Sequence, residues 1–216
     1  MEKNTAKGII VFSIISIILI IFGFILFEYV DMVDGVILQF VRNKLTFEWI
    51  KNIMYVISMI LSPLPMLVIL IIFTLLCNNK ITPIIVTLNS AIAGIITFIL
   101  KNIFRRERPF DYMLIEQDGY SFPSAHSMIG IAFYGTLICC INKYIKSKSL
   151  KVVLNVILWF FMICTPISRV YLGVHNLTDI LVGVIFGIII VRTSEYVIKK
   201  LKEKEDKNLL KLEAKK

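Results

Sequence analysis

The chain of 216 residues contains only two histidines, His126 and His175, and each stands in a short polar segment between apolar runs. Imidazole changes its charge near neutral pH, so it can serve as nucleophile, acid or base. His175 and Asp179 are four residues apart, a spacing that places both on one face of a helix, where the carboxylate can hold one ring nitrogen as a donor. The other nitrogen is then left as a nucleophile or base. The alternative for each residue alone is structural: a hydrogen-bonded interfacial histidine, and an acid that stabilises the start of a helix.

Basic residues share these polar segments. Four of them crowd into positions 101–108, directly after an apolar run, and Arg169 lies six residues before His175. Cations in such a cluster can bind an anion, and the planar fork of arginine can bind two oxygens at once. We therefore predict an anion site that needs no metal, because no Asp/Glu/His cluster has metal-ligand spacing. The alternative for positions 101–108 is a basic flank balanced by nearby acids, namely Glu107, Asp111 and Glu116.

The rest of the chain is strongly apolar. Hydrophobic residues make up 57% of it and charged residues 18%, and the mean hydropathy is +0.82. A soluble domain has about 25% charged residues, so a water-soluble globule is excluded. The net charge of +9 could favour nucleic acid in another chain, but here long apolar runs separate the charges. We expect a lipid bilayer as the partner and no nucleic acid.

Six apolar runs predict membrane-spanning helices. The first, 8–27, has 20 residues without a charge, which cover the hydrocarbon thickness as a helix and exceed the core of a signal peptide. In the second run, Pro63 and Pro65 predict a kink or the start of its regular part. The six runs are 8–27, 53–77, 81–100, about 127–141, 152–167 and 177–191, the last continuing towards 198.

The segment between the first two runs has apolar residues at helical spacing. This pattern predicts an amphipathic helix along the membrane surface, with an ordinary loop as the alternative. The apolar positions are Val33, Val36, Ile37, Phe40 and Val41, and the charged residues that fall elsewhere are Asp31, Asp34, Arg42 and Lys44.

Six crossings place both ends of the chain on the same side of the membrane. Of the 24 Lys and Arg residues, 16 then lie on the side of the termini and eight on the other side. Because basic residues favour the cytoplasmic side, we expect both termini in the cytoplasm. Residues 1–198 form the predicted membrane domain, and residues 199–216, where Lys alternates with Glu and Asp, form a charged cytoplasmic tail.

Spans that alternate in direction bring the polar segments together. The end of the third span, the start of the fourth, the end of the fifth and the start of the sixth all fall on the side opposite to the termini. We therefore predict an all-α fold, an integral membrane six-helix bundle with its active site at the extracytoplasmic face. The phosphate of a membrane lipid already lies at this depth.

The three polar segments resemble the signatures of the type 2 phosphatidic acid phosphatase family: Lys-x6-Arg-Pro, Pro-Ser-x-His and Ser-Arg-x5-His-x3-Asp. The six-span layout is also similar to that of the bacterial lipid phosphatases of the family. Ala125 stands where the family most often has glycine. The alanine side chain adds a methyl group close to the expected phosphate. The resemblance assigns no role to Arg105 and Arg106. The matching residues are Lys101, Arg108, Pro109, Pro123, Ser124, His126, Ser168, Arg169, His175 and Asp179.

The resemblance implies a membrane lipid phosphatase that uses no metal and no cofactor. His175 would attack phosphorus to form a phosphohistidine, Asp179 would orient its ring, and His126 would protonate the leaving oxygen and then act as a base. The implied substrates are phosphatidylglycerol phosphate, phosphatidic acid or undecaprenyl diphosphate, which these residues do not separate. The residues implied to hold the phosphate are Lys101, Arg108, Arg169, Ser124 and the N–H groups near Ala125, with Ser168 as a weaker candidate.

Two other classes of protein are weighed against this interpretation. A channel or transporter places its ionisable residues near the middle of its spans, whereas the polar segments here lie at helix ends. A protein that only binds or transports anionic lipid would need the arginines but not the pair of His175 and Asp179. Either alternative would have no catalytic activity.

Overall fold

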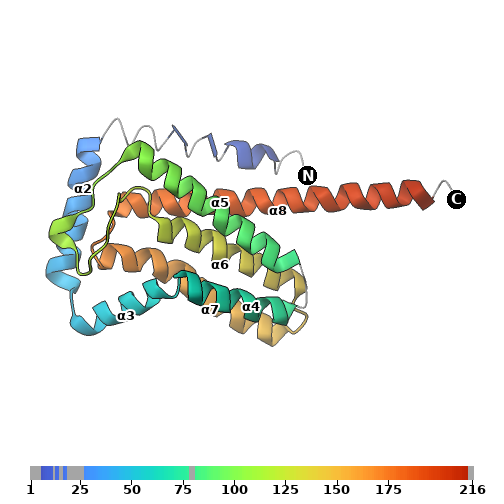
Figure 1. The fold of residues 1–216 in the computed structure, drawn as a ribbon, viewed down its shortest axis with the longest axis horizontal. Helices are drawn as coiled ribbons and strands as arrows, with labels where there is room; N and C mark the ends of the chain where they lie inside the picture. Colours follow the sequence, from blue (N-terminus) through green and yellow to red (C-terminus); the bar gives the residue numbers. More distant parts are fainter. Residues whose placement is uncertain (1–5, 12, 15–16, 19–26, 78–80, 214–216) are drawn as a thin grey trace.

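The computed structural model describes residues 6–11, 13–14, 17–18, 27–77 and 81–213, and within these ranges every regular element is helical (Figure 1). The predicted first span, 8–27, lies mostly outside the described residues. The helices in chain order are α2 (Phe27–Phe40), the π-helical turn η1 (Val41–Leu45), α3 (Glu48–Met59), α4 (Pro63–Cys77), α5 (Ile81–Phe104), the 3-10 turn η2 (Phe110–Tyr112), α6 (Ala125–Tyr144), α7 (Lys148–Tyr171) and α8 (Leu177–Glu213).

Four helices in the described part of the chain are long and apolar enough to cross a membrane. They confirm the third to sixth predicted runs as helices, each extended into polar flanks. The count of six spans stays a prediction. The four segments are Thr82–Phe104, Ala125–Tyr144, Lys148–Tyr171 and Leu177–Lys199.

The second predicted run is a broken helix. Helix α3 ends at Met59, α4 begins at Pro63, and the two are bent by 63° relative to each other. Proline suits the first position of a helix because the N–H it lacks would have no acceptor within that helix. This confirms the predicted kink, with Pro63 as the first residue of α4, whereas residues 53–59 are already helical in α3. The bent pair would count as a fifth span if it is one crossing.

Helices α5 to α8 alternate in direction, and α2 lies across one end of them (Figure 1). The last turn of α5, the first of α6, the last of α7 and the first of α8 therefore meet at that end. Helix α8 continues past the opposite end as far as Glu213, so residues 199–213 of the predicted tail are a helical extension of the last span.

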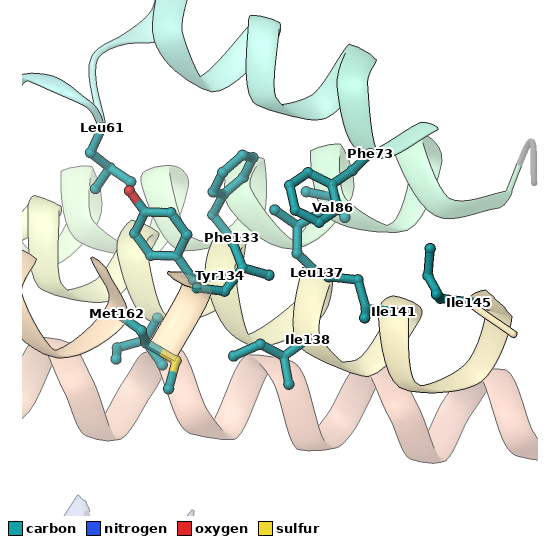
Figure 2. Close-up of a cluster of buried hydrophobic side chains, with 12 residues drawn as sticks. Leu61, Phe73, Val86, Phe133, Tyr134, Leu137, Ile138, Ile141, Ile145 and Met162 are labelled. Atoms are coloured by element: carbon teal, nitrogen blue, oxygen red, sulfur yellow. The ribbon is translucent and has the colours of Figure 1, made fainter. Parts of the chain in front are cut away.

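Helix α6 is the centre of the bundle. Its membrane-length segment is 67% buried, against 22% for those of α5 and α7. Phe133 and Leu137 are buried among Val86 of α5, Phe73 of α4 and Leu158 of α7 (Figure 2). A helix that is apolar all round and buried on all sides sets the positions of the helices around it.

Two glycines let α8 approach α6 closely. A Cβ atom on Gly183 would lie 2.8 Å from the carbonyl oxygen of Ser124, and one on Gly187 would lie 2.6 Å from Cβ of Ile131. No side chain fits at these distances, so the Gly-x-x-x-Gly pattern serves packing within the bundle. The first turn of α8 is thereby held against the start of α6.

The segment after the first run forms helix α2, as predicted, but its polar face is turned inwards. Asp34 is 1% exposed, whereas the apolar Val36 is 62% exposed. Leu38, on the same side as Asp34, packs against Val170 of α7 and Ile180 of α8. The membrane-surface position of the exposed apolar face stays a prediction.

Large apolar side chains cover the outer faces of the bundle. Leu75 of α4, Phe98 of α5 and Val156 of α7 are 74%, 69% and 63% exposed. Extended apolar surfaces of this kind are rare on soluble monomers and suit contact with lipid tails. The chain is a multi-pass membrane protein.

Candidate active site

The predicted site residues gather at the end of the bundle that α2 crosses. Lys101 lies in the last turn of α5, His126 is the second residue of α6, and Arg169 lies in the last turn of α7. His175 and Asp179 lie on either side of the start of α8. Three segments that are far apart in the sequence therefore form one cluster, as predicted from the alternating spans.

His175 and Asp179 form a close pair, but not in the way that their spacing predicts. Helix α8 begins at Leu177, so His175 lies before the helix, and the prediction of a shared helical face is wrong. Oδ2 of Asp179 instead accepts a hydrogen bond of 2.9 Å from the backbone N–H of Asn176, as in a capping box. This brings Oδ2 to 3.4 Å from Nδ1 of His175.

The distance between Nδ1 and Oδ2 is at the outer limit for a hydrogen bond, and Nδ1 of His175 has no hydrogen-bond partner among the described residues. His175 is 2% exposed, and burial lowers its pKa to about 4, although the negative charge of Asp179 opposes this shift. The ring is therefore neutral at pH 7. A proton on Nδ1, facing the carboxylate, leaves a lone pair on Nε2.

Arg108 lies beside Nε2 of His175. Its Nη1 atom is 3.3 Å from Nε2 and donates a hydrogen bond of 2.6 Å to the carbonyl of Val174. Burial lowers the pKa of Arg108, against the attraction of Asp179 and Asp118, but the guanidinium stays charged at pH 7. A phosphoryl group in front of Nε2 would lie next to this cation.

One short segment, residues 117–121, contacts all three predicted phosphate-binding cations. Lys101 donates to the carbonyls of Tyr120 and Ser121, the latter at 3.4 Å. Arg108 donates to the carbonyls of Asp118, Gly119 and Tyr120 at 2.8–3.4 Å. Arg169 donates a hydrogen bond of 2.9 Å to Oε1 of Gln117. The 117–121 segment thus supplies the acceptors for these cations in this structure.

Ser124 and Ser168 contact backbone groups of the bundle. The hydroxyl of Ser124 caps α6 by accepting a hydrogen bond of 3.3 Å from the N–H of Ser127, while Ser168 donates one of 2.7 Å to the carbonyl of Thr165 in its own helix. The backbone N–H of Ser124 donates to the carbonyl of Asp179, at 3.1 Å, which ties the starts of α6 and α8 together. Ala125 opens α6, where backbone N–H groups have no acceptor within the helix and can bind an anion.

His126 belongs to the same electrostatic neighbourhood. Its ring interacts with the charges of Arg169, Arg108 and Lys101 and with His175. Both imidazoles of the chain and all three predicted cations are therefore close enough to interact electrostatically.

Arg106 was not assigned a role by sequence reasoning, yet it makes the densest set of contacts in the site. It is buried, and its guanidinium bonds Asp179, Asp34, Asp31 and the hydroxyl of Thr178. Burial lowers the pKa of Arg106, but the charge of Asp179 and the hydrogen bonds with Asp34 and Asp31 outweigh it and raise the pKa above its usual value. The only sequence signal for this role was a surplus of cations in positions 101–108.

Sequence reasoning also missed two partners of Arg169. This guanidinium is 1% exposed, and besides Gln117 it donates to the hydroxyl of Ser58 in α3, at 2.5 Å. Ser58 is fully buried and 111 residues away in the chain. No local pattern marks a single serine in an apolar helix as a partner of an arginine.

The described residues contain no group of three or more His, Cys, Asp or Glu side chains that could hold a metal ion. Asp31, Asp34 and Asp179 surround Arg106 instead, so the carboxylates near the site already have a cation among them. The cations of the site are side chains of the protein.

Known proteins are similar to this chain over part of its length. Phosphatidylglycerophosphatase B of Bacillus subtilis (strain 168) is 36% identical over 94 residues, which cover 43% of this chain and 46% of that protein. The dolichyldiphosphatase of Saccharomyces cerevisiae is 34% identical over 100 residues (41% of this chain and 40% of that one). Lipid phosphate phosphatase gamma of Arabidopsis thaliana is 31% identical over 101 residues, or 44% of each chain. The chain spans less than half the length of these curated relatives.

The fold also has a solved counterpart. It is similar, with a TM-score of 0.73 and 22% identity, to the crystal structure of the first transmembrane PAP2 type phosphatidylglycerolphosphate phosphatase from Bacillus subtilis, over 86% of this chain and 96% of that one. The profile of the PAP2 superfamily matches residues 82–203, which include every predicted site residue. These findings confirm the resemblance to the type 2 phosphatidic acid phosphatases, and the chain belongs to the PAP2 superfamily.

Proposed function

We propose that the protein is a membrane lipid phosphatase that hydrolyses a lipid phosphomonoester or diphosphate through a phosphohistidine on His175. The observation that carries the proposal is the position of His175, whose Nδ1 lies 3.4 Å from Asp179 while Nε2 lies 3.3 Å from Arg108. One side of the ring thus meets a carboxylate and the other a cation that suits phosphate. The names of the relatives support a phosphatase.

In the first step, the lone pair on Nε2 of His175 attacks phosphorus. The bond between phosphorus and the lipid oxygen breaks, its electron pair goes to that oxygen, and the protonated ring of His126 supplies the proton that neutralises it. Asp179 stabilises the positive charge that develops on the His175 ring. Lys101, Arg108 and Arg169 stabilise the charge on the phosphoryl oxygens, with Ser124 and the N–H groups near Ala125 as further donors.

In the second step, water replaces the histidine. His126, now neutral, takes a proton from a water molecule whose oxygen attacks phosphorus, and the bond between phosphorus and Nε2 breaks with its electron pair returning to His175. Inorganic phosphate is released in this step. If the substrate is a diphosphate, His175 attacks the terminal phosphorus, and the lipid monophosphate is the leaving group of the first step. Since Lys101, Arg108 and Arg169 can supply the positive charge that the phosphoryl oxygens need, we propose that no metal takes part.

The substrate is inferred from depth and from the relatives. His175 and Lys101 lie at the ends of membrane-length helices, where the phosphate of a lipid can enter from the side while its tails stay in the bilayer. The candidates are phosphatidylglycerol phosphate, phosphatidic acid and a polyprenyl diphosphate such as undecaprenyl diphosphate.

We further propose the six-span topology, with both termini in the cytoplasm and the site on the extracytoplasmic face. Two exposed loop residues at opposite ends of the bundle test it: Glu116→Cys and Lys146→Cys, in a chain without its native cysteines. A membrane-impermeant maleimide added to intact cells should label Glu116→Cys and not Lys146→Cys. Labelling of only Lys146→Cys would reverse the topology, and labelling of both only after lysis would place the site inside the cell.

The activity is tested with purified full-length protein in detergent. Release of phosphate from each candidate lipid is measured for the wild type, for His175→Asn and His126→Ala, and for Arg105→Gln as a matched control in the exposed part of the same segment. We expect activity in the wild type and the control only, and the same activity with EDTA present. Labelled substrate should leave an acid-labile phosphoprotein in the wild type but not in His175→Asn.

Other results would overturn specific parts of the proposal. If the wild type releases phosphate from none of the lipids, the protein is not this phosphatase, and binding of the same lipids would favour the non-catalytic alternative. Activity that disappears with EDTA and returns with magnesium would contradict the metal-free mechanism. An active His175→Asn variant would exclude His175 as the nucleophile.

A further inference from the structure

We propose that Arg106 is a positioning residue for the histidine pair: it holds Asp179 so that Oδ2 faces His175, and the acids of α2 hold Arg106 in turn. This inference rests on the proposed hydrolysis. Arg106 contacts Asp179, and it would act on His175 through that carboxylate.

The guanidinium of Arg106 is a bridge between two helices. Its Nη1 atom donates hydrogen bonds of 2.8 Å both to Oδ1 of Asp179 and to the hydroxyl of Thr178 in α8. Its Nη2 atom donates to Oδ2 of Asp34 at 2.9 Å, and also to Asp31, both in α2. A planar group with donors in fixed directions can hold four acceptors at once in a way that a lysine cannot.

The two oxygens of Asp179 have different partners. Oδ1 bonds Arg106, whereas Oδ2 accepts from the backbone N–H of Asn176 and faces Nδ1 of His175. The last torsion of an aspartate is broad and roughly two-fold, so one anchor leaves the carboxylate free to rotate. Two anchors on opposite oxygens define the direction in which Oδ2 points.

Helix α2 completes this arrangement. Asp34 is 1% exposed, and its Oδ1 atom accepts a hydrogen bond of 3.1 Å from the backbone N–H of Thr178, next to Asp179. The hydroxyl of Thr178 also bonds Asp34. A buried carboxylate needs such partners, since an unpaired charge in the interior is strongly destabilising. Asp34 thus fixes both Arg106 and the first turn of α8.

The charges in this network allow a test that distinguishes a positioning role of Arg106 from a purely structural one. Removing the positive charge of Arg106 makes the surroundings of His175 more negative, which raises the pKa of His175. The groups that act on His175 are Asp179 of α8, Arg108 of the loop before α6, Arg169 of α7 and His126 of α6, with Lys101 of α5 acting on His126. All of these groups remain in an Arg106 variant, so a change in the pKa of His175 would be due to the loss of the Arg106 charge.

The variants are Arg106→Gln, which removes the charge, Arg106→Lys, which keeps it without the fork, and Asp34→Asn, which weakens the anchor in α2. Arg105→Gln is the control, because the side chain of Arg105 is exposed and, within the described part of the chain, donates to the carbonyl of Asn102 in the last turn of α5. Folding is verified by size-exclusion chromatography and thermal unfolding in detergent. The pH dependence of kcat and KM is then measured with the lipid on which the wild type is active.

We expect kcat to fall by about 100-fold in all three variants, as for a misplaced catalytic group, with KM within about threefold because no phosphate contact is lost. The acidic limb of the kcat/KM profile should move to higher pH in Arg106→Gln and stay in place in Arg106→Lys. Arg105→Gln should match the wild type in every measurement.

The possible failures are distinct. An inactive wild type refutes the proposed function and not the geometry around Arg106. With an active wild type, a folded Arg106→Gln that keeps its kcat and its acidic limb overturns the inference. If Arg106→Gln does not fold, Arg106→Lys and Asp34→Asn decide: a reduced kcat at constant KM supports the positioning role, and an unchanged kcat overturns it.

Discussion

Nδ1 of His175 lies 3.4 Å from Oδ2 of Asp179, although His175 precedes helix α8 and Asp179 is its third residue. The separation is longer than an ordinary hydrogen bond, so the two groups lie close together without forming one. Hydrogen bonds in active sites often shorten only when the substrate is bound. Positive charge on the ring of His175 during phosphoryl transfer would draw the carboxylate closer.

Asp179→Asn should therefore reduce kcat much more than it affects KM. The new amide has an NH2 group, which would face either the donors of Arg106 or the backbone N–H of Asn176 and Nδ1 of His175. Because the amide is neutral, it also cannot balance positive charge on the ring of His175. By analogy with the aspartate of a serine protease triad, we expect a loss on the order of 10³- to 10⁴-fold. Steady-state kinetics on folded variant protein measure it, and a loss confined to KM would contradict the orienting role.

The acidic limb of the kcat/KM profile should reflect the buried state of His175. Burial lowers the pKa of His175 from 6.5 to about 4, so the nucleophile stays neutral, and the enzyme active, well below pH 6.5. The unfolded chain takes up this proton near pH 6.5, so stability falls as the pH drops from 6.5 towards 4. Activity and thermal unfolding are measured over this range, and a limb near pH 6.5 would contradict the buried environment.

Gly187→Ala should destabilise the bundle. The new Cβ would lie 2.6 Å from Cβ of Ile131, so α8 must move away from α6, at a cost of about 1–3 kcal/mol. Gly94→Ala is the matched control, because its Cβ would meet only Ile129, at 4.0 Å. Thermal unfolding in detergent should show a lower midpoint for Gly187→Ala alone, and equal midpoints would contradict the close approach.

Ser58→Ala should weaken the binding of phosphate. It leaves one donor of the buried Arg169 without its acceptor, which costs about 1–3 kcal/mol, and it frees the guanidinium to change orientation. Inhibition by inorganic phosphate, together with KM, measures the effect. The control is Ser90→Ala, whose hydroxyl bonds only the carbonyl of Val86 in its own helix, and the same result for both variants would exclude a role through Arg169.

Features that depend on local pattern were predicted well. The lengths of apolar runs identified α5 to α8, and Pro63 marked the start of α4, because helix formation and bilayer thickness act on consecutive residues. Alternation of these helices then placed His126 and His175 together. The spacing of His175 and Asp179 identified the correct pair, but the predicted geometry was wrong. The two residues meet at the start of α8 and do not share a helical face.

Features that depend on distant partners were missed. Arg106 and Asp34 are 72 residues apart, and Arg169 and Ser58 are 111 apart. A charged residue on an amphipathic helix such as α2 normally faces water, so no local pattern predicts that Asp34 is buried. Only the packing of α2 across the end of the bundle turns its acids towards Arg106.

In the 117–121 segment, the acceptors for Lys101 and Arg108 are main-chain oxygens, and this limits how substitutions in the segment can change the affinity for phosphate. A peptide dipole has no proton to gain in acid and is present whichever amino acid occupies the position. An incoming phosphate dianion therefore exchanges places with neutral acceptors and does not have to break an ion pair at Lys101 or Arg108. Substitutions at residues 118–121 would tune affinity through the shape of the backbone, with Gly119 at a φ of 76° as the position where any side chain is most disruptive.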